Sequence, residues 1–221
     1  MDDKRWSAVD AFFGETIVGR DSVLEAALAA NAAAGLPSID VSAAQGKMLY
    51  LLARMTGAQK ALEIGTLGGY STICIARALP RDGRLLTIEA VAKHADVARA
   101  NIARAGLGDR VEVRAGAALD ILPKIEAEGL GPFDFVFIDA DKTNNANYLT
   151  WALRLSRLRT VIIVDNVVRD GRIVDASSRD PDVTGTRRMF EMMAREPRLQ
   201  ATAIQTVGDK GWDGFVLAIV K

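Results

Sequence analysis

The sequence predicts an α/β fold whose sheet is mostly parallel, with an antiparallel pair of strands at one edge. From residue 60 onward, short apolar segments alternate with helix-like segments, which is the pattern of repeated βα units. The segments FDFVFI (133–138) and TVIIV (160–164) are almost continuously apolar, as expected for strands buried on both faces of a parallel sheet. The last two strand-like segments, 201–207 and 214–220, follow one another without a helix, which indicates an edge hairpin.

The remaining strands and helices follow from the same alternation. Five helices are expected to cross between the strands in the right-handed sense and to cover both faces of the sheet. The seven expected strands cover residues 60–64, 84–88, 111–114, 133–138, 160–164, 201–207 and 214–220. The five expected helices cover residues 70–79, 91–105, 117–127, 143–155 and 183–195.

Two alanine-rich helices are expected before the first strand. The first, at residues 22–34, ends at a glycine with a proline shortly after it, a combination that stops helices. The second begins at Ser42, where Ser42 and Gln45 have the spacing of a capping box. These segments contain too few large apolar residues to fold alone, so residues 1–57 are expected to cover an α/β core at 58–221 within one domain.

Composition excludes several classes of protein. Hydrophobic residues make up 49% and charged residues 25% of the 221 residues, which supports a sizeable core and argues against disorder. Lys plus Arg (28) equals Asp plus Glu (28), whereas general nucleic-acid or membrane-surface binders have a basic excess. Cys74 is the single cysteine, so no internal disulfide forms and no Cys/His zinc cluster exists. The acidic start and the lack of a membrane-length apolar segment predict a cytoplasmic protein with no membrane partner.

A glycine-rich turn after the first strand predicts a nucleotide-type cofactor. Residues 65–69 connect a strand to a helix, and glycine lets the backbone approach a ligand closely. Glu89 ends the next strand, where a carboxylate can accept hydrogen bonds from two ribose hydroxyls. Tyr70 replaces the third glycine of the dinucleotide pattern, and Glu63 disfavours a pyrophosphate nearby. A turn flanked by acids instead suits S-adenosylmethionine, which has a ribose, an ammonium group and a sulfonium.

Acidic side chains also follow the strands at 133–138 and 160–164. Asp139 and Lys142 come after the first of these strands, and Asp165 and Asn166 after the second. If the strands are neighbours, two carboxylates and one amide oxygen meet at one sheet edge, a ligand set that suits Mg²⁺ or a similar cation such as Mn²⁺ or Ca²⁺. Such a cation would bind two vicinal substrate oxygens and make one hydroxyl more acidic, and Lys142 would take its proton.

Residues 37–221 resemble the cation-dependent O-methyltransferases of the caffeoyl-CoA and catechol type. The matching stretches are ALEIGTLGGYST, LLTIE, FDFVFIDADK and VIIVDNVVRDG. The resemblance implies a Rossmann-like, S-adenosylmethionine-dependent methyltransferase fold with a seven-stranded sheet. It also implies that Asp139, Asp165 and Asn166 bind the metal and that Lys142, together with Asp139, is catalytic. The residues that it implies for the methyl-donor site are Val41, Glu63, Gly65, Thr66, Ser71, Glu89, Ala118, Asp139 and Asp141.

The sequence departs from the family pattern at positions that bear on the acceptor. Asp170 stands where relatives often have a substrate-contacting asparagine, and Glu191 also replaces an asparagine. Both add acid near the expected substrate entrance, which favours a small or cationic acceptor over a coenzyme A thioester. Leu158, Arg159 and Thr160 replace a glycine pair before the fifth strand, which should alter that turn but not the site.

These features predict methylation of one hydroxyl in a vicinal pair on a small, catechol-like aromatic. Three alternatives remain: methylation of a hydroxylated transfer-RNA base by the same fold, a nucleotide-cofactor oxidoreductase, and a binding module without catalysis. A homodimer is expected because symmetric dimers are the commonest assemblies of such domains. His94 is expected on the surface, and Tyr148 in the core.

Overall fold

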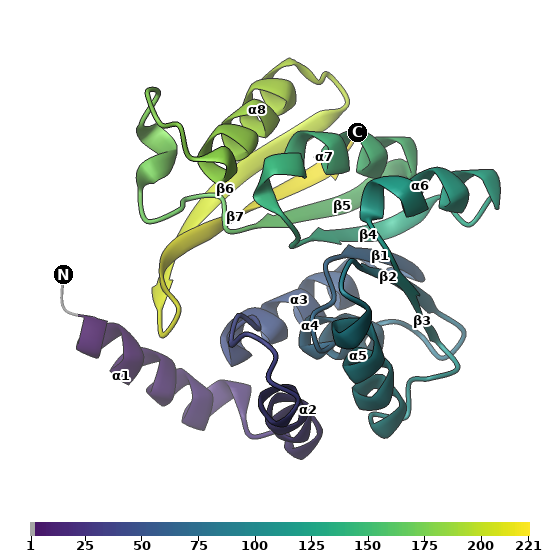
Figure 1. Cartoon of the computed structure of the whole chain (residues 1–221), viewed down its shortest axis with the longest axis vertical. Coiled ribbons are helices and arrows are strands. Elements are labelled where there is room, and N and C mark those ends of the chain that lie inside the picture. The colour runs from purple at the N-terminus through teal and green to yellow at the C-terminus, as the bar shows by residue number, and fades with distance from the viewer. Residues whose placement is uncertain (1–2) are drawn as a thin grey trace.

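The computed structural model describes residues 3–221 and contains the predicted seven-stranded sheet (Figure 1). The strand order is β3-β2-β1-β4-β5-β7-β6, and β7 alone among the described strands runs in the direction opposite to the rest. The bounds are β1 Lys60–Ile64, β2 Arg84–Glu89, β3 Val111–Ala115, β4 Phe133–Ile138, β5 Ser156–Asp165, β6 Leu199–Gly208 and β7 Gly211–Val220.

Helices cover both faces of the sheet, and each face has its own apolar core. In Figure 1, α3, α4 and α5 lie below the sheet and α6, α7 and α8 above it. Phe135 and Phe137 point into the lower core, whereas Val136 and Ile138 point into the upper core, as the alternation of a strand requires. The helix bounds are α1 Asp3–Phe13, α2 Ser22–Ala33, α3 Ala43–Met55, α4 Tyr70–Ala78, α5 Ala92–Arg104, α6 Ala118–Ala127, α7 Asn145–Arg154 and α8 Pro181–Arg195. Short helical turns lie at η1 Gly14–Val18, η2 Lys142–Asn144 and η3 Arg172–Val174.

The register of the central strands determines where the site forms. Ile64 of β1 pairs with Ile138 of β4, and Ile138 pairs with Val164 of β5. The residues that follow these three positions therefore emerge side by side at one edge of the sheet. This edge is the carboxyl end of the parallel strands, where open α/β sheets bind ligands.

The terminal hairpin is longer than the sequence suggested. The predicted loop at 208–213 is wrong, because β6 and β7 continue to Gly208 and from Gly211 with only Asp209 and Lys210 between them. Most of β6 is exposed at the sheet edge, so its side chains lack the apolar pattern that would mark the ends of the strand. We call Asp209 and Lys210 the hairpin tip.

The fifth strand also begins earlier than predicted, at Ser156 instead of residue 160. The added residues 156–159 are mostly exposed and polar, and the β4–β5 pairing is irregular between Phe133 and Phe135. Arg159 adopts a left-handed backbone conformation with φ of 73°, at the position where the sequence departs from a glycine pair. Residues 156–159 lie at the end of β5 opposite Asp165.

The N-terminal segment lies on the same side of the sheet as α4 and α5. Helix α3 packs its buried Leu49 and Ala53 into the lower core, while α1 projects beside the hairpin tip (Figure 1). The predicted boundary after residue 57 falls in the turn between α3 and β1. Within residues 3–221, no helix is long and apolar enough to cross a membrane.

Candidate active site

A cavity of about 700 Å³ opens at the carboxyl ends of β1, β2, β4 and β5. Residues 38–41, before α3, and Lys210 of the hairpin tip line its outer part. The predicted site residues that line it are Val41, Gly65, Thr66, Ser71, Glu89, Ala118, Asp139, Asp141, Lys142, Asp165 and Asn166. The fold thus brings together residues that are far apart in the chain.

The glycine turn passes very close to the end of β4. Gly65 has φ of 95°, and its N–H donates to the carbonyl of Ile88 at 2.9 Å. A β-carbon at residue 65 would lie 1.9 Å from the carbonyl oxygen of Asp139. Position 65 therefore requires glycine both for its conformation and for the space that it leaves.

Glu89 holds the turn in place and faces the cavity. Its carboxylate accepts hydrogen bonds from the N–H groups of Thr66 (3.1 Å), Leu67 (2.8 Å) and Val91 (2.9 Å). His94 Nδ1 lies 3.6 Å from the same carboxylate. A carboxylate has about four acceptor sites, so Glu89 can accept a further hydrogen bond from a ligand hydroxyl.

Glu63 lies beneath the turn and not on the cavity wall. Its side chain is fully buried and accepts hydrogen bonds from Ser71 Oγ (2.6 Å), Thr87 Oγ1 (2.7 Å) and the Thr72 hydroxyl. Burial raises the pKa of Glu63 to about 7, although these hydrogen bonds favour the ionised form. Glu63 is therefore linked to the cavity only through Ser71, which does line it.

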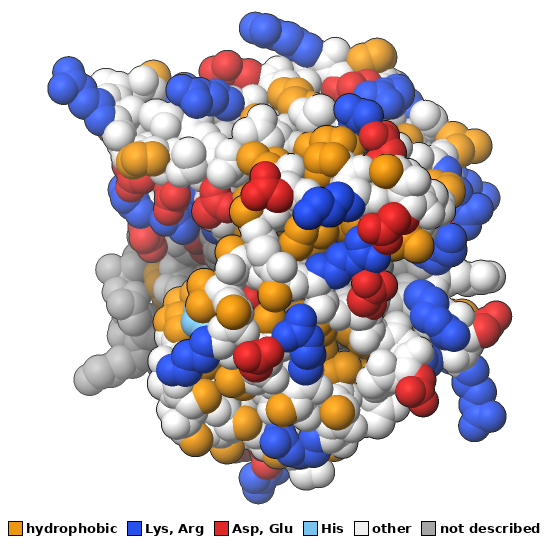
Figure 2. All heavy atoms as spheres, turned by 45° about the vertical axis from the view of Figure 1, so that its right-hand side comes forward, with side chains coloured by type: hydrophobic (Ala, Val, Ile, Leu, Met, Phe, Trp, Pro, Cys, Tyr) orange, Lys and Arg blue, Asp and Glu red, His pale blue; other side chains and the backbone are white. Residues whose placement is uncertain are grey.

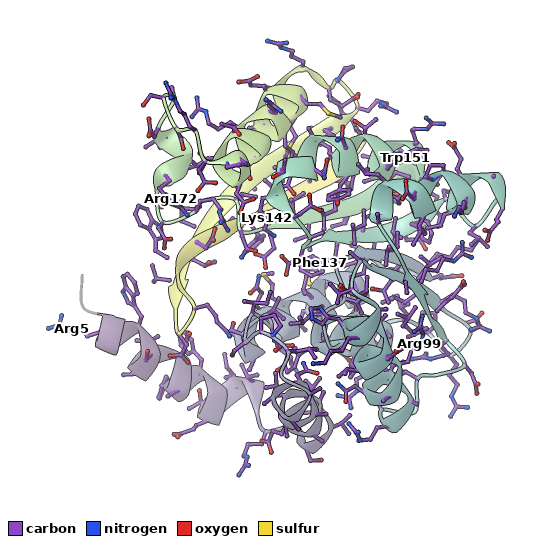
Figure 3. All side chains as sticks on the ribbon, in the orientation of Figure 1. Arg5, Arg99, Phe137, Lys142, Trp151 and Arg172 are labelled. Carbon is purple, nitrogen blue, oxygen red and sulfur yellow. The ribbon has the colours of Figure 1, made fainter. Side chains whose placement is uncertain are left out.

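The ends of β4 and β5 bring two carboxylates together with a lysine. Lys142 Nζ donates to Asp139 Oδ1 at 2.6 Å, and the Lys142 side chain is only 8% exposed. Figure 3 shows Lys142 near the middle of the molecule, whereas Arg5 lies at its edge. Burial, and then the nearby charge of Asp139, raise the pKa of Asp165 above its ordinary value.

Two neighbours hold Asp165 in place. Its Oδ1 accepts from the N–H of Asn166 at 2.8 Å, and its Oδ2 accepts from Gln45 Nε2 at 2.6 Å. Asn166 has a left-handed backbone conformation (φ 56°), which asparagine tolerates better than most residues.

The donor set at this edge fits a hard divalent cation. Asp139 and Asp165 supply carboxylate oxygens, and Asn166 can supply an amide oxygen. Burial, and then the charge of Asp139, disfavour ionised Asp165, and a bound cation would favour it. Nowhere in residues 3–221 do three His, Cys, Asp or Glu side chains form a metal-ligating group, so this set has only two charged ligands.

Asp141 is held by the helix that follows it. Asn144 Nδ2 donates to Asp141 at 2.6 Å, and the Tyr148 hydroxyl donates to its other oxygen. Tyr148 also lines the cavity, with Ala118 and Ile88 from neighbouring elements. These residues form an apolar wall with one carboxylate, a suitable environment for a heteroaromatic ring.

The two acidic residues expected near the acceptor, Asp170 and Glu191, lie outside the cavity. Asp170 is exposed, and its N–H donates to the carbonyl of Trp212 at 3.2 Å. Arg169 and Asp170 both have positive φ (57° and 55°), and this turn directs Arg169 to the cavity wall instead. A contact between Asp170 and an acceptor would require it to turn inward. Glu191 lines a separate shallow hollow on α8, so the expectation that it adds acid at the substrate entrance is wrong.

Several cavity residues carried no clear signal in the sequence. Gln45 was interpreted only as part of a helix cap, and His94 as a surface residue, yet both line the cavity. Tyr148 is buried as expected, but its hydroxyl is part of the site. The position of Tyr148, two helical turns after Asp141, could have suggested its contact with Asp141. The position of His94, shortly after Glu89 at the end of β2, could have suggested that His94 lies near that carboxylate.

Comparison with known proteins assigns the family. A family model described as O-methyltransferase matches residues 15–219. A catechol O-methyltransferase of Mycobacterium tuberculosis is 58% identical over 96% of this chain and 95% of its own length. A catechol O-methyltransferase of Niastella koreensis is 50% identical over the full length of both chains.

Solved structures agree with the sequence relatives. An O-methyltransferase from Bacillus cereus in complex with SAH superimposes with a TM-score of 0.98 at 58% identity, covering 99% of this chain and 100% of that one. The O-methyltransferase TomG from Streptomyces achromogenes, in complex with SAM, gives a TM-score of 0.97 at 49% identity, covering 100% of this chain and 99% of that one. Their shared fold and the matched residues lead to one conclusion: this chain belongs to the O-methyltransferase family.

Proposed function

We propose that this enzyme transfers the methyl group of S-adenosylmethionine to one hydroxyl of a vicinal pair on a small aromatic acceptor, with the help of a divalent cation. The printed names of two close relatives, both catechol O-methyltransferases, support this acceptor class. The observation that carries the proposal is the meeting of Asp139, Lys142, Asp165 and Asn166 in one cavity with the glycine turn.

The inner part of the cavity suits the methyl donor, which relatives bind as SAM or SAH. Glu89 can accept a ribose hydroxyl, because its carboxylate has about one acceptor site left after the three backbone N–H groups that it binds. Tyr148, Ala118 and Asp141 can surround the adenine. Ser71 and the backbone of the turn can bind the amino-acid end, and Val41, which lines the cavity from the loop before α3, can cover the donor.

The acceptor side is supplied by β4 and β5. Asp139, Asp165 and Asn166 would hold the cation, with Mg²⁺ preferred because the ligands are all hard oxygens. Such a cation, when bound, would hold two neighbouring acceptor oxygens and make one hydroxyl more acidic. Lys142 Nζ lies beside this position, 2.6 Å from Asp139 Oδ1, where it can take the hydroxyl proton. Orienting both reactants in one cavity can lower the barrier by roughly 7–11 kcal/mol in favourable cases.

A methylation assay tests this proposal. Catechol and a matched monohydroxy aromatic are compared as acceptors, first with Mg²⁺, then with excess chelator, and then with Mg²⁺ restored. We expect turnover of catechol alone, its loss with chelator and its recovery with Mg²⁺. Asp139→Ala should lose nearly all turnover under every condition. Full activity in chelator would contradict the proposed mechanism.

Methylation of a hydroxylated transfer-RNA base is the second candidate, and charge argues against it. The net charge is zero, and on the face shown in Figure 2 Lys and Arg are interspersed with Asp and Glu instead of forming a basic surface. Methyl transfer to bulk transfer RNA, compared with catechol in the same preparation, separates the two. A nicotinamide cofactor should not raise the melting temperature, because Tyr70 occupies the place of a pyrophosphate-binding glycine.

A homodimer is also proposed, formed through the N-terminal helical segment. No side chain between residues 5 and 18 is buried in the single chain, and Phe12 and Ile17 are 61% and 75% exposed. A short helix without a buried face is marginal in water, so α1 needs a packing partner, and a second copy is the commonest one. Light scattering should give the mass of a dimer for the full chain and that of a monomer for Phe12→Glu combined with Ile17→Glu.

A further inference from the structure

Gln45 connects the N-terminal helices to the candidate cation site. Its Nε2 donates to Asp165 Oδ2 at 2.6 Å, across 120 positions of sequence. Gln45 is in the first turn of α3, and its own N–H is bound by Ser42 Oγ at 3.2 Å. In a full capping box the Gln45 side chain would bind back to the N–H of Ser42. Here it binds the end of β5 instead.

The packing of α3 against α4 fixes the distance between Gln45 and Asp165. Gly46, the next residue, is buried against α4, and a β-carbon there would meet Tyr70 Cε1 at 2.9 Å and Cys74 Sγ at 3.0 Å. The helix therefore sits as close to α4 as glycine allows. Gln45 is held at a defined distance from Asp165 and does not depend on a flexible loop.

The Gln45 amide is a suitable hydrogen-bond partner for a carboxylate that binds a metal. Asp165 is only 3% exposed, and its two oxygens accept from the Asn166 backbone and from Gln45. These two bonds set the rotation of the carboxylate. Lys142 already pairs with Asp139, so a second cationic partner would cancel the negative charge that attracts a metal, whereas a glutamine orients Asp165 without doing so.

We propose that Gln45 is a positioning residue that orients Asp165 for cation binding, so that helix α3 completes the cation site. This inference rests on the proposed metal dependence. Removing such an outer hydrogen bond from a ligand typically weakens metal binding 10–100-fold.

Calorimetric titration of Mg²⁺ into the full chain tests the proposal without relying on turnover. Gln45→Met keeps the size and helix preference of the side chain but removes the donor, and Gln45→Asn keeps the amide but shortens its reach. Lys47→Met, on the exposed side of the same helix, is the matched control. We expect Mg²⁺ to bind roughly 10–100-fold more weakly to both Gln45 variants. SAH affinity and melting temperature should stay near the wild-type values, and the control should bind Mg²⁺ normally.

The outcomes separate this inference from the proposed function. If the wild-type chain and both Gln45 variants bind Mg²⁺ with equal affinity, the proposed role of Gln45 is overturned, whereas the proposed metal dependence is not. A parallel loss of SAH affinity in both variants would also overturn it, because Gln45 would then support the whole cavity. Absence of Mg²⁺ binding by the wild-type chain would overturn the metal dependence itself, and this inference with it.

Discussion

Replacing Gly65 with alanine should damage the site more than any ordinary loop substitution, because β1 and β4 meet at this residue. The added β-carbon would lie 1.9 Å from the Asp139 carbonyl oxygen and 2.6 Å from its carbonyl carbon. Both are backbone atoms at the end of a central strand, so no side-chain rotation can relieve the clash. Asp139 itself would have to move.

Gly57 provides a matched control for the conformational part of the cost. It also has a positive φ (64°), but a β-carbon there meets no atom within 4 Å. Alanine in this conformation costs about 1–2 kcal/mol, reduced by about 0.4–1 kcal/mol because alanine has less freedom than glycine in the unfolded chain. Gly57→Ala should therefore destabilise the protein by about 1 kcal/mol, a fall of about 2–4 °C in melting temperature for a chain of this size.

Gly65→Ala should cost much more. The Asp139 carbonyl would have to retreat from 1.9 Å to at least the ordinary contact of 3.4 Å. Such a backbone displacement belongs with the most severe single substitutions, about 4 kcal/mol or more, so the melting temperature should fall by roughly 8–16 °C. SAH binding should be lost as well, since the turn and Asp139 both line the cavity.

Thermal unfolding and SAH titration of both variants, side by side, provide the measurement. Equal losses of stability in Gly57→Ala and Gly65→Ala, with SAH affinity retained, would refute the close approach between the glycine turn and β4.

Three further substitutions test separate parts of the structure. Lys142→Met should lower kcat by about 10²–10⁴-fold with little change in SAH affinity, and an unchanged kcat would remove Lys142 from the proton transfer. Arg159→Gly should raise the melting temperature by roughly 1–4 °C, because glycine relieves the left-handed conformation at φ 73°; a lower melting temperature would count against that strain. Because burial raises the pKa of Glu63 from 4.5 to about 7, its proton stabilises the fold fully below about pH 4.5, and this contribution is lost as the pH rises through about 7. The free energy of unfolding of the wild-type protein should therefore fall by up to about 3 kcal/mol over that pH range. Denaturant unfolding at pH 5 and pH 8 measures this change, and the free energy of unfolding of Glu63→Gln should fall less than that of the wild type. Equal falls in both proteins would refute the raised pKa.

The parts of the site that lie at strand ends could be predicted from sequence. The strands before Asp139 and Asp165 are apolar and end abruptly in charge, and parallel neighbours must present those ends at one edge. The glycine turn and Glu89 follow from the same rule applied to the first two strands.

The parts that depend on long-range packing could not be predicted. The bond from Gln45 to Asp165 depends on how closely α3 packs on α4, and helix periodicity gives no information about that distance. The exposure of Asp170 depends on the left-handed backbone conformations of Arg169 and Asp170, and no turn motif in the sequence predicted these conformations. The strand at 201–207 was predicted, but the ends of β6 were misplaced because an exposed edge strand has no apolar face to mark where it begins and ends.

A crystal structure of the enzyme with SAH, Mg²⁺ and catechol would test the central claim most directly. We predict one cation bound by oxygens of Asp139, Asp165 and Asn166, with the catechol oxygens beside Lys142 Nζ and a ribose hydroxyl of SAH on Glu89. A cation bound elsewhere, or catechol in the cavity with these three side chains free of metal, would contradict it.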